Sequence, residues 1–183
     1  LGRSTSEASR VYVSARFGTG RLGLPRDSIT PIWTAGALPA AGIGDLRQDA
    51  LDRLTSGRQI SIGVEVGDDA YFMRAMTRPA DLADQLKIMV TKFVHPGWDP
   101  APVLRARAAM LLGLRMATSS PGDVLARQLG AILRDGDKRW ATPDEREVDA
   151  LTPESFRDFW DRILATGTIE LSIFGDFDPE AAR

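Results

Sequence analysis

The sequence offers few side chains that could do chemistry. It contains one histidine, His95, and no cysteine among its 183 residues. Protein zinc sites are built mainly from histidine and cysteine, so no histidine pair or thiolate cluster can form, and disulfide bonds are excluded as well. We therefore assign no metal-ligating residue and expect no cofactor to be bound by this chain.

His95 is also the one residue that could act as the base of a Ser-His-Asp set. It stands in the sequence Val-His-Pro-Gly, which is typical of a loop that closes a helix. A side chain that can carry positive charge is mildly favoured at a helix C-terminus. This structural interpretation outweighs the catalytic one, so we assign no catalytic residue.

Three short acidic stretches resemble fragments of a calcium site, at 68–69, 135–137 and 176–178. None is followed by the spaced ligands and the distal glutamate of an EF-hand loop. Aspartate next to glycine is ordinary turn chemistry, because the carboxylate accepts from the local backbone. We therefore interpret all three as turns.

Two further patterns are weak signals for phosphate or nucleic acid. The glycines of 16–20 lack the Gly-Lys-Ser/Thr of a phosphate loop. Arg105, Arg107 and Arg115 share one predicted helix, but no aromatic residue lies between them, so they indicate a solvated face. The chain has 23 Lys and Arg against 25 Asp and Glu, a net charge of −2. We expect no nucleic-acid partner, no membrane insertion and no cofactor-binding residue.

The stretch from 59 to 82 organises the predicted fold. Apolar and polar residues alternate in it before a Gly-Asp-Asp turn at 67–69, and a second, more apolar strand follows at 71–76. This pattern predicts a β-hairpin that leads into a helix. The residues of the apolar face in the first strand are Ile60, Ile62, Val64 and Val66.

Further strands are predicted at 10–17 and 168–174, and short helices at 31–38 and 45–54. Longer helices are announced by a cap residue followed by proline, since proline suits the first helical turn. These starts are Asp99-Pro100, Ser120-Pro121, Thr142-Pro143 (with Glu145 completing a capping box) and Thr152-Pro153.

Each longer helix carries an apolar stripe that should face the sheet. The clearest stripe is Phe156, Phe159, Trp160, Ile163 and Leu164. The other predicted stripes are Leu82, Leu86, Met89, Val90 and Phe93, then Leu104, Ala108, Leu111 and Leu112, and then Leu125, Leu129, Ile132 and Leu133.

The order of elements predicts an α+β sandwich with a mixed or antiparallel four-stranded sheet covered by helices. We expect residues 1–183 to form a single domain. The first residues contain no initiator methionine and no signal-peptide pattern, and 178–180 resembles a helix start. We therefore expect a fragment of a longer multi-domain chain.

The chain contains, in order, the runs VSARFGTGRLGLPRD, AAGIGDL, GVEVGDDAYFMRAMTRPADL, HPGWDP, LTPESFRDFW and IELSIFGDFD. With these runs the sequence from 11 to 180 resembles the pitrilysin-type, insulinase-like zinc metallopeptidases. It is most similar to the C-terminal, non-catalytic half of bacterial members. The resemblance implies a sheet backed by helices, similar to processing peptidases, in a protein whose two halves close around a peptide.

In active members of that family an inverted zinc motif, His-x-x-Glu-His, follows the first strand, and a second glutamate lies on a later helix. The resemblance places the first motif at 33–37, which reads Trp-Thr-Ala-Gly-Ala, and the later glutamate in the helix after Pro100. There is no glutamate from Val66 to Asp144. The resemblance therefore implies an inactive domain, with zinc held in the catalytic half of the parent protein.

We expect a non-catalytic domain that completes the substrate chamber and helps to bind peptide. Its partners would be a peptide substrate and a catalytic domain on the same or another chain. One alternative is an inert structural subunit of the processing-peptidase or respiratory-complex core type, and another is an unrelated α+β binding module. Similarity to bacterial members implies a periplasmic or envelope location.

Overall fold

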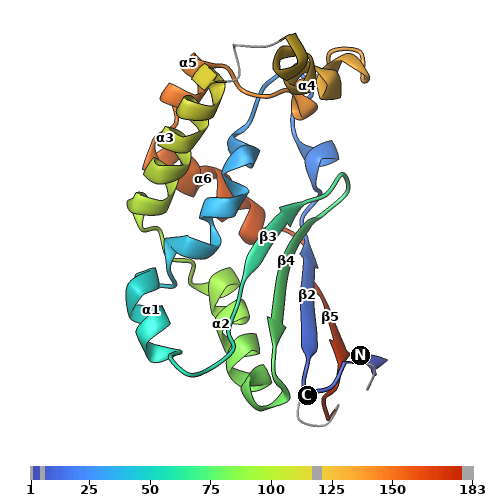
Figure 1. The fold of residues 1–183 in the computed structure, drawn as a ribbon, viewed down its shortest axis with the longest axis vertical. Helices are drawn as coiled ribbons and strands as arrows, with labels where there is room; N and C mark the ends of the chain where they lie inside the picture. Colours follow the sequence, from blue (N-terminus) through green and yellow to red (C-terminus); the bar gives the residue numbers. More distant parts are fainter. Residues whose placement is uncertain (1, 5–6, 117–120, 179–183) are drawn as a thin grey trace.

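The computed structural model describes residues 2–4, 7–116 and 121–178. The strands lie side by side in one layer, and α1, α2, α3 and α6 lie on one side of them (Figure 1). The predicted α+β class is therefore confirmed. The helix start expected at 178–180 and the cap expected at Ser120 lie outside the described residues.

The sheet has the strand order β1-β5-β2-β4-β3. Strands β5, β2, β4 and β3 run antiparallel to their neighbours, and β1 pairs in parallel with β5. The predicted four-stranded sheet is confirmed, and the two-residue β1 is an addition that the sequence did not indicate. The bounds are β1 Gly2–Arg3, β2 Val11–Phe17, β3 Gly63–Val66, β4 Tyr71–Thr77 and β5 Glu170–Gly175.

The predicted hairpin is formed by β3 and β4. The main-chain N–H of Gly67 donates to the carbonyl oxygen of Ala70 at 2.9 Å and closes the turn around Asp68 and Asp69. Regular pairing with β4 begins only at Gly63. The observed strand is therefore shorter than the segment in which apolar and polar residues alternate, which begins at Ile60. The segment before Gly63 is tied to the core by side chains instead of by a backbone ladder, as described below.

The helical layer contains six α-helices and five short 3₁₀ segments in the described residues. The α-helices are α1 Gln48–Leu54, α2 Leu82–Val94, α3 Pro100–Met116, α4 Pro121–Ile132, α5 Glu145–Asp149 and α6 Pro153–Leu164. The 3₁₀ segments are η1 Arg21–Gly23, η2 Pro31–Ala37, η3 Pro39–Ala41, η4 Pro79–Asp81 and η5 Lys138–Trp140.

Of two helix starts predicted from cap residues, one is confirmed and the other is wrong. Thr152 caps α6 as predicted, because its hydroxyl accepts from the N–H of Ser155 at 3.1 Å. The capping box expected at Thr142 with Glu145 is wrong. Asp144 and Glu147 form the capping box of α5, while the Thr142 hydroxyl donates to the carbonyl of Arg127 at 3.1 Å. Both pairs fit the local cap pattern, and the tertiary contact of Thr142 decides between them.

The core lies between the sheet and α6. The inner face of β2 is buried, as its alternation predicts, and four of the five residues of the apolar stripe of α6 are buried, while Ile163 is half-buried. Trp160 is 0% exposed, and its ring centroid lies 5.7 Å from that of Tyr71 on β4. The inner residues of β2 are Val11, Val13, Ala15 and Phe17.

Two predicted stripes do not face the core. No residue of α4 is buried in the described structure, and the four residues of the predicted stripe, the last of which, Leu133, directly follows the helix, are between 41% and 71% exposed. On α3 the predicted Leu104 and Leu112 are exposed, whereas Val103 and Leu114 are buried. Helical spacing determines which side chains share a face, but not whether another element covers that face.

Candidate functional site

The positions at which the resemblance places the zinc motif, 33–37, lie in η2 and serve in packing. Thr34 is 0% exposed, and its hydroxyl accepts from Nε1 of Trp160 at 2.9 Å and donates to the carbonyl of Pro31 at 2.5 Å. Ala35 and Ala37 are also buried. These side chains supply no imidazole, no carboxylate and no general base, so they do not fit a zinc ion.

Other acidic side chains do not gather around this place. In the described part of the chain, no three His, Asp or Glu side chains lie close enough together to hold a metal ion. The helix in which the resemblance places the second glutamate is α3, whose sequence contains none. That the chain binds no cofactor stays a prediction, which a measurement of zinc content can test.

Lys92 on α2 is the most unusual charged group beside this segment. It is 2% exposed, and its Nζ donates to the carbonyl oxygens of Leu38 at 3.3 Å, of Pro39 at 2.7 Å, and of Gly42. Burial lowers the pKa of Lys92 to about 8. An ammonium group has three N–H donors, so all of its donors are used to hold the end of η2 and the turn of η3.

The segment 59–61, just before β3, is held by side chains from β4, η4 and α2. The N–H of Gln59 donates to Asp81 at 2.9 Å, and the N–H of Ser61 donates to Oε1 of Gln85 at 3.0 Å. The hydroxyl of Ser61 also accepts from the N–H of Met76 at 3.0 Å, in place of a backbone partner. The Gln59 amide and then Arg78 hold the pKa of Asp81 below its ordinary value.

Replacing Gln85 with leucine tests this attachment. Gln85 is 0% exposed, and its loss leaves the N–H of Ser61 without its acceptor. We expect the free energy of unfolding to fall by about 1 to 2 kcal/mol, and hydrogen exchange at the Ser61 amide to speed up. The matched control is Lys87→Leu on the exposed side of α2, with an expected change below about 0.5 kcal/mol. Equal effects of the two variants would contradict the role of Gln85.

Strand β3 is one of the two edges of the sheet, because it pairs with β4 on one side and is the last strand in the order; the two-residue β1 is the other edge. Hydrogen-bonded and non-hydrogen-bonded pairs alternate in an antiparallel ladder. Because Gly67 and Ala70 form a hydrogen-bonded pair, Glu65 with Phe72 is the next one, and the backbone groups of Val64 and Val66 point away from β4. These groups therefore take no part in the ladder to β4.

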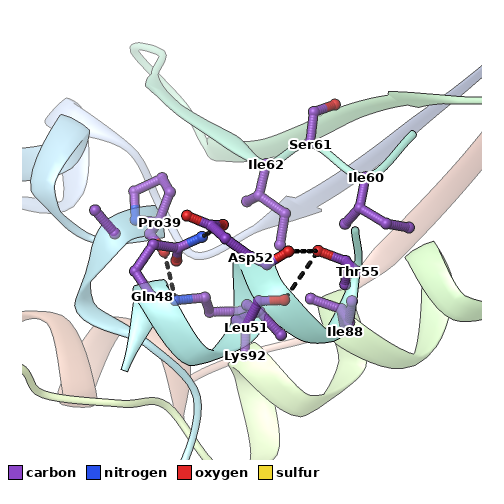
Figure 2. A pocket seen from close by; sticks show the side chains of 11 residues that line it. Pro39, Gln48, Leu51, Asp52, Thr55, Ile60, Ser61, Ile62, Ile88 and Lys92 are labelled. Atoms are coloured by element: carbon purple, nitrogen blue, oxygen red, sulfur yellow. Dashed lines mark hydrogen bonds between the residues drawn. The ribbon is translucent and has the colours of Figure 1, made fainter. Parts of the chain in front are cut away.

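A cavity of about 250 Å³ lies between the segment 60–62, which precedes β3, and helices α1 and α2. Figure 2 shows Ile60 and Ile62 pointing toward the helices and Ser61 pointing away. On the helical side, Gln48 and Asp52 of α1 line the cavity, and Nε2 of Gln48 donates to Oδ1 of Asp52 at 2.7 Å. The remaining wall contains the aliphatic side chains of Leu51 and Ile88 together with Thr55 and Lys92.

The residues that the sequence singled out lie elsewhere. His95 follows α2 as an exposed loop residue, and its N–H donates to the carbonyl of Thr91 at 2.7 Å, as expected for a helix end. The acidic stretches are separate turns. Asp69 pairs with Arg16 at 2.9 Å, and Asp137 pairs with Arg139 at 2.7 Å.

Two of the three arginines of α3 lie on the predicted solvated face, because Arg105 and Arg115 are exposed. Arg115 also lies 3.6 Å from a carboxylate oxygen of Glu145. Arg107 is half-buried and donates to the carbonyl of Leu151 at 3.1 Å, so it connects α3 to the end of α5.

Sequence reasoning missed Lys92 and Gln85, although a signal was present. Leu82, Gln85, Met89 and Lys92 are spaced as one helical face, and all four are buried. Two polar residues on the apolar side of a predicted helix indicate buried hydrogen-bonding groups. Their acceptors and donors come from distant segments, so their partners could not be named from the sequence.

Comparison of the sequence with protein-family models gives no match, and comparison with curated protein sequences gives none either. The structure, however, is similar to several solved proteases. Among the described helices, none is long and apolar enough to cross a membrane.

Three similar structures are the periplasmic protease PqqL from Escherichia coli, a peptidase M16 inactive domain from Pseudomonas fluorescens, and the ferredoxin protease FusC. PqqL gives a TM-score of 0.79 at 17% identity over 99% of this chain and 20% of its own. The inactive domain gives 0.76 at 15% identity over 98% of this chain and 44% of its own. FusC, solved as an E83A mutant with Arabidopsis ferredoxin, gives 0.72 at 17% identity over 96% and 19%.

This chain thus spans about a fifth of PqqL and FusC and under half of the inactive-domain structure. At these identities the similarity concerns the fold, and it agrees with the family that the sequence motifs resemble. The resemblance is confirmed at that level: the chain has the fold of the M16, pitrilysin-type peptidase domains, including a domain described as inactive.

Proposed function

We propose that this chain is a non-catalytic domain of a pitrilysin-type metallopeptidase, which completes the substrate chamber and helps to bind peptide. Residues 1–183 would form one domain of a longer chain, whose catalytic half holds the zinc. The observation that carries the proposal is the free edge of β3, which lies beside an η2 segment devoted to packing. A binding edge without zinc ligands suits holding a peptide and not cutting it.

Peptide would bind by adding a strand to β3. The outward N–H and C=O groups of Val64 and Val66 would exchange hydrogen bonds with an extended chain, independent of most of its sequence. The structure of FusC contains a bound ferredoxin, so a protein with this fold in part of its chain binds a polypeptide. This supports a peptide-binding role for the present chain.

Replacing Val66 with proline tests the binding edge. Proline removes the outward N–H of residue 66 and leaves the ladder to β4, because this N–H points to the free side. We expect the Kd for short extended peptides to rise at least about tenfold, the equivalent of about 1.4 kcal/mol. Fluorescence anisotropy with labelled peptides measures this change.

The control is Val66→Ala, which shortens the side chain and keeps the N–H. Circular dichroism should show that both variants are folded. If Val66→Pro and Val66→Ala bind peptide as tightly as the original chain, the edge is not the binding surface. Zinc in stoichiometric amount together with peptide hydrolysis by this chain alone would contradict the non-catalytic role.

The alternative is an inert structural subunit of the processing-peptidase or respiratory-complex core type. Such a subunit would use the same fold without binding peptide. If the unmodified chain shows no measurable affinity for peptides, this alternative is favoured. The free β3 edge favours the first proposal, since a long-lived structural subunit gains nothing from an uncovered strand edge.

A further inference from the structure

A second cavity, of about 230 Å³, lies between η1, η2, α3 and η5. The charged residues that line it are Arg21, Lys138 and Arg139, and no aspartate or glutamate of the described residues lines it. Pockets for drug-sized ligands measure roughly 300 to 1,000 Å³, so a cavity of this size suits a single amino-acid residue. The cavity therefore combines positive charge with a small volume.

Of these three cationic side chains, one is neutralised by a carboxylate and two are not. The ion pairs of this region join Asp137 to Arg139 at 2.7 Å and to Arg26 at 3.8 Å. Neither Arg21 nor Lys138 forms an ion pair within the described residues. Two positive charges at the cavity are therefore without a counter-charge from this part of the chain.

The guanidinium of Arg21 is held in place at the cavity. Arg21 is half-buried, and its Nη1 donates to the carbonyl oxygen of Arg139 at 2.8 Å. In return, Nη1 of Arg139 donates to the carbonyl oxygen of Leu22 at 2.7 Å. These bonds join η1 to η5. A guanidinium has five N–H donors, and a partly buried charge is unfavourable without a partner, so the remaining donors of Arg21 favour an anionic ligand.

The rest of the wall is largely aromatic and aliphatic. Trp33 of η2 and Trp140 of η5 are both half-buried and line the cavity, together with Ile32 and Met110. An inorganic anion would contact none of this apolar surface productively, and a glutamate side chain has only a short apolar stem. A C-terminal residue with an apolar side chain fits both parts of the cavity, because its carboxylate and its side chain are attached to the same Cα atom.

We propose that this cavity binds the free C-terminal residue of a peptide when that residue has an apolar side chain. The carboxylate would pair with Arg21 and Lys138, and the side chain would pack against Trp33 and Trp140. A guanidinium suits this role because its planar fork can bind a carboxylate through two hydrogen bonds. The site goes beyond the function proposed above and does not depend on strand addition to β3.

The test uses N-acetylphenylalanine, which has a free carboxylate, and its amide, which has none. Both are too short to form a strand on β3, so they report on the cavity alone. Their Kd values for the full chain are measured by calorimetry at low ionic strength. We expect the acid to bind at least about tenfold more tightly than the amide. N-acetylalanine and inorganic phosphate should both bind more weakly than N-acetylphenylalanine.

Variants of the two unpaired cations assign the preference to the cavity. Arg21→Gln and Lys138→Gln should each weaken binding of the acid several-fold and leave binding of the amide unchanged, whereas Arg21→Lys should retain part of the affinity. The matched control is Arg26→Gln, which removes one positive charge from the same region but does not line the cavity, and it should leave the preference nearly unchanged. Circular dichroism checks folding, and the exposed Lys138 decides the test if Arg21→Gln does not fold.

The outcomes separate this site from the β3 edge. Equal binding of the acid and the amide overturns the site, and so does an acid preference that survives in both Arg21→Gln and Lys138→Gln. Phosphate or N-acetylalanine that binds as tightly as N-acetylphenylalanine also overturns it, because the apolar wall would then have no role. If none of the probes binds, the site is rejected whatever the result for Val66→Pro. An acid preference that is lost in these variants supports the site even if Val66→Pro binds peptides normally.

Discussion

Replacing Trp160 with alanine is expected to lower the free energy of unfolding by about 4 kcal/mol. Trp160 is 0% exposed, and its ring contacts Tyr71 and Phe159 at centroid distances of 5.7 Å and 5.2 Å. The substitution would leave a large cavity between α6 and the sheet, and Thr34 would lose its indole donor. Urea unfolding followed by circular dichroism measures the change.

Two further variants keep this prediction testable if the alanine variant does not fold. Trp160→Phe keeps most of the apolar volume and loses the Nε1 donor, so we expect a smaller loss of about 1 to 2 kcal/mol. Phe174→Ala removes an aromatic ring that is 52% exposed on β5, with an expected loss below about 1 kcal/mol. If Trp160→Ala and Trp160→Phe are both as stable as Phe174→Ala, Trp160 is not the centre of the core.

Raising the pH from 7.5 to 9.5 is expected to increase the free energy of unfolding by about 2 kcal/mol. Burial lowers the pKa of Lys92 from 10.5 to about 8, so the unfolded chain binds more protons than the folded chain between these values. Stability must then rise with pH in this range. Below pH 8 the folded chain holds a buried ammonium group whose desolvation the carbonyls of η2 and η3 only partly offset.

The rise of the free energy of unfolding with pH ends near pH 10, because the ionisation of Tyr71 has the opposite effect on stability. Burial raises the pKa of Tyr71 from 10.0 to about 12, so the unfolded chain loses this proton first and stability falls above pH 10. The control is Lys92→Met, which lacks the titrating group. We expect this variant to show little change between pH 7.5 and 9.5, and a rise as large as that of the original chain would contradict the assignment to Lys92.

The segment at which the resemblance places the zinc motif is held by packing contacts. Thr34 anchors η2 to α6, and Lys92 anchors the end of the same segment to α2. Both interactions hold η2 next to β3.

Much of the fold could be predicted because its signals are local. The alternation predicted for β2 and the helical spacing of the α6 stripe correctly gave their buried faces, because side chains that recur with the period of the element lie on the same side of it. The same argument failed for α4, whose stripe is as regular and yet exposed. An apolar stripe shows which side chains a helix can bury together. Whether they are buried depends on which other elements pack against that face.

The sequence by itself determined what this chain lacks: cysteine, a second histidine, and any glutamate between Val66 and Asp144. These are facts of composition, and with the ordered motifs they indicated a non-catalytic member of a zinc-peptidase fold. Only the tertiary structure decided that Lys92 holds η2 and η3 and that Gln48 and Asp52 face Ile60 and Ile62 across a cavity. Such contacts join residues distant in sequence, so their geometry depends on packing and not on local pattern.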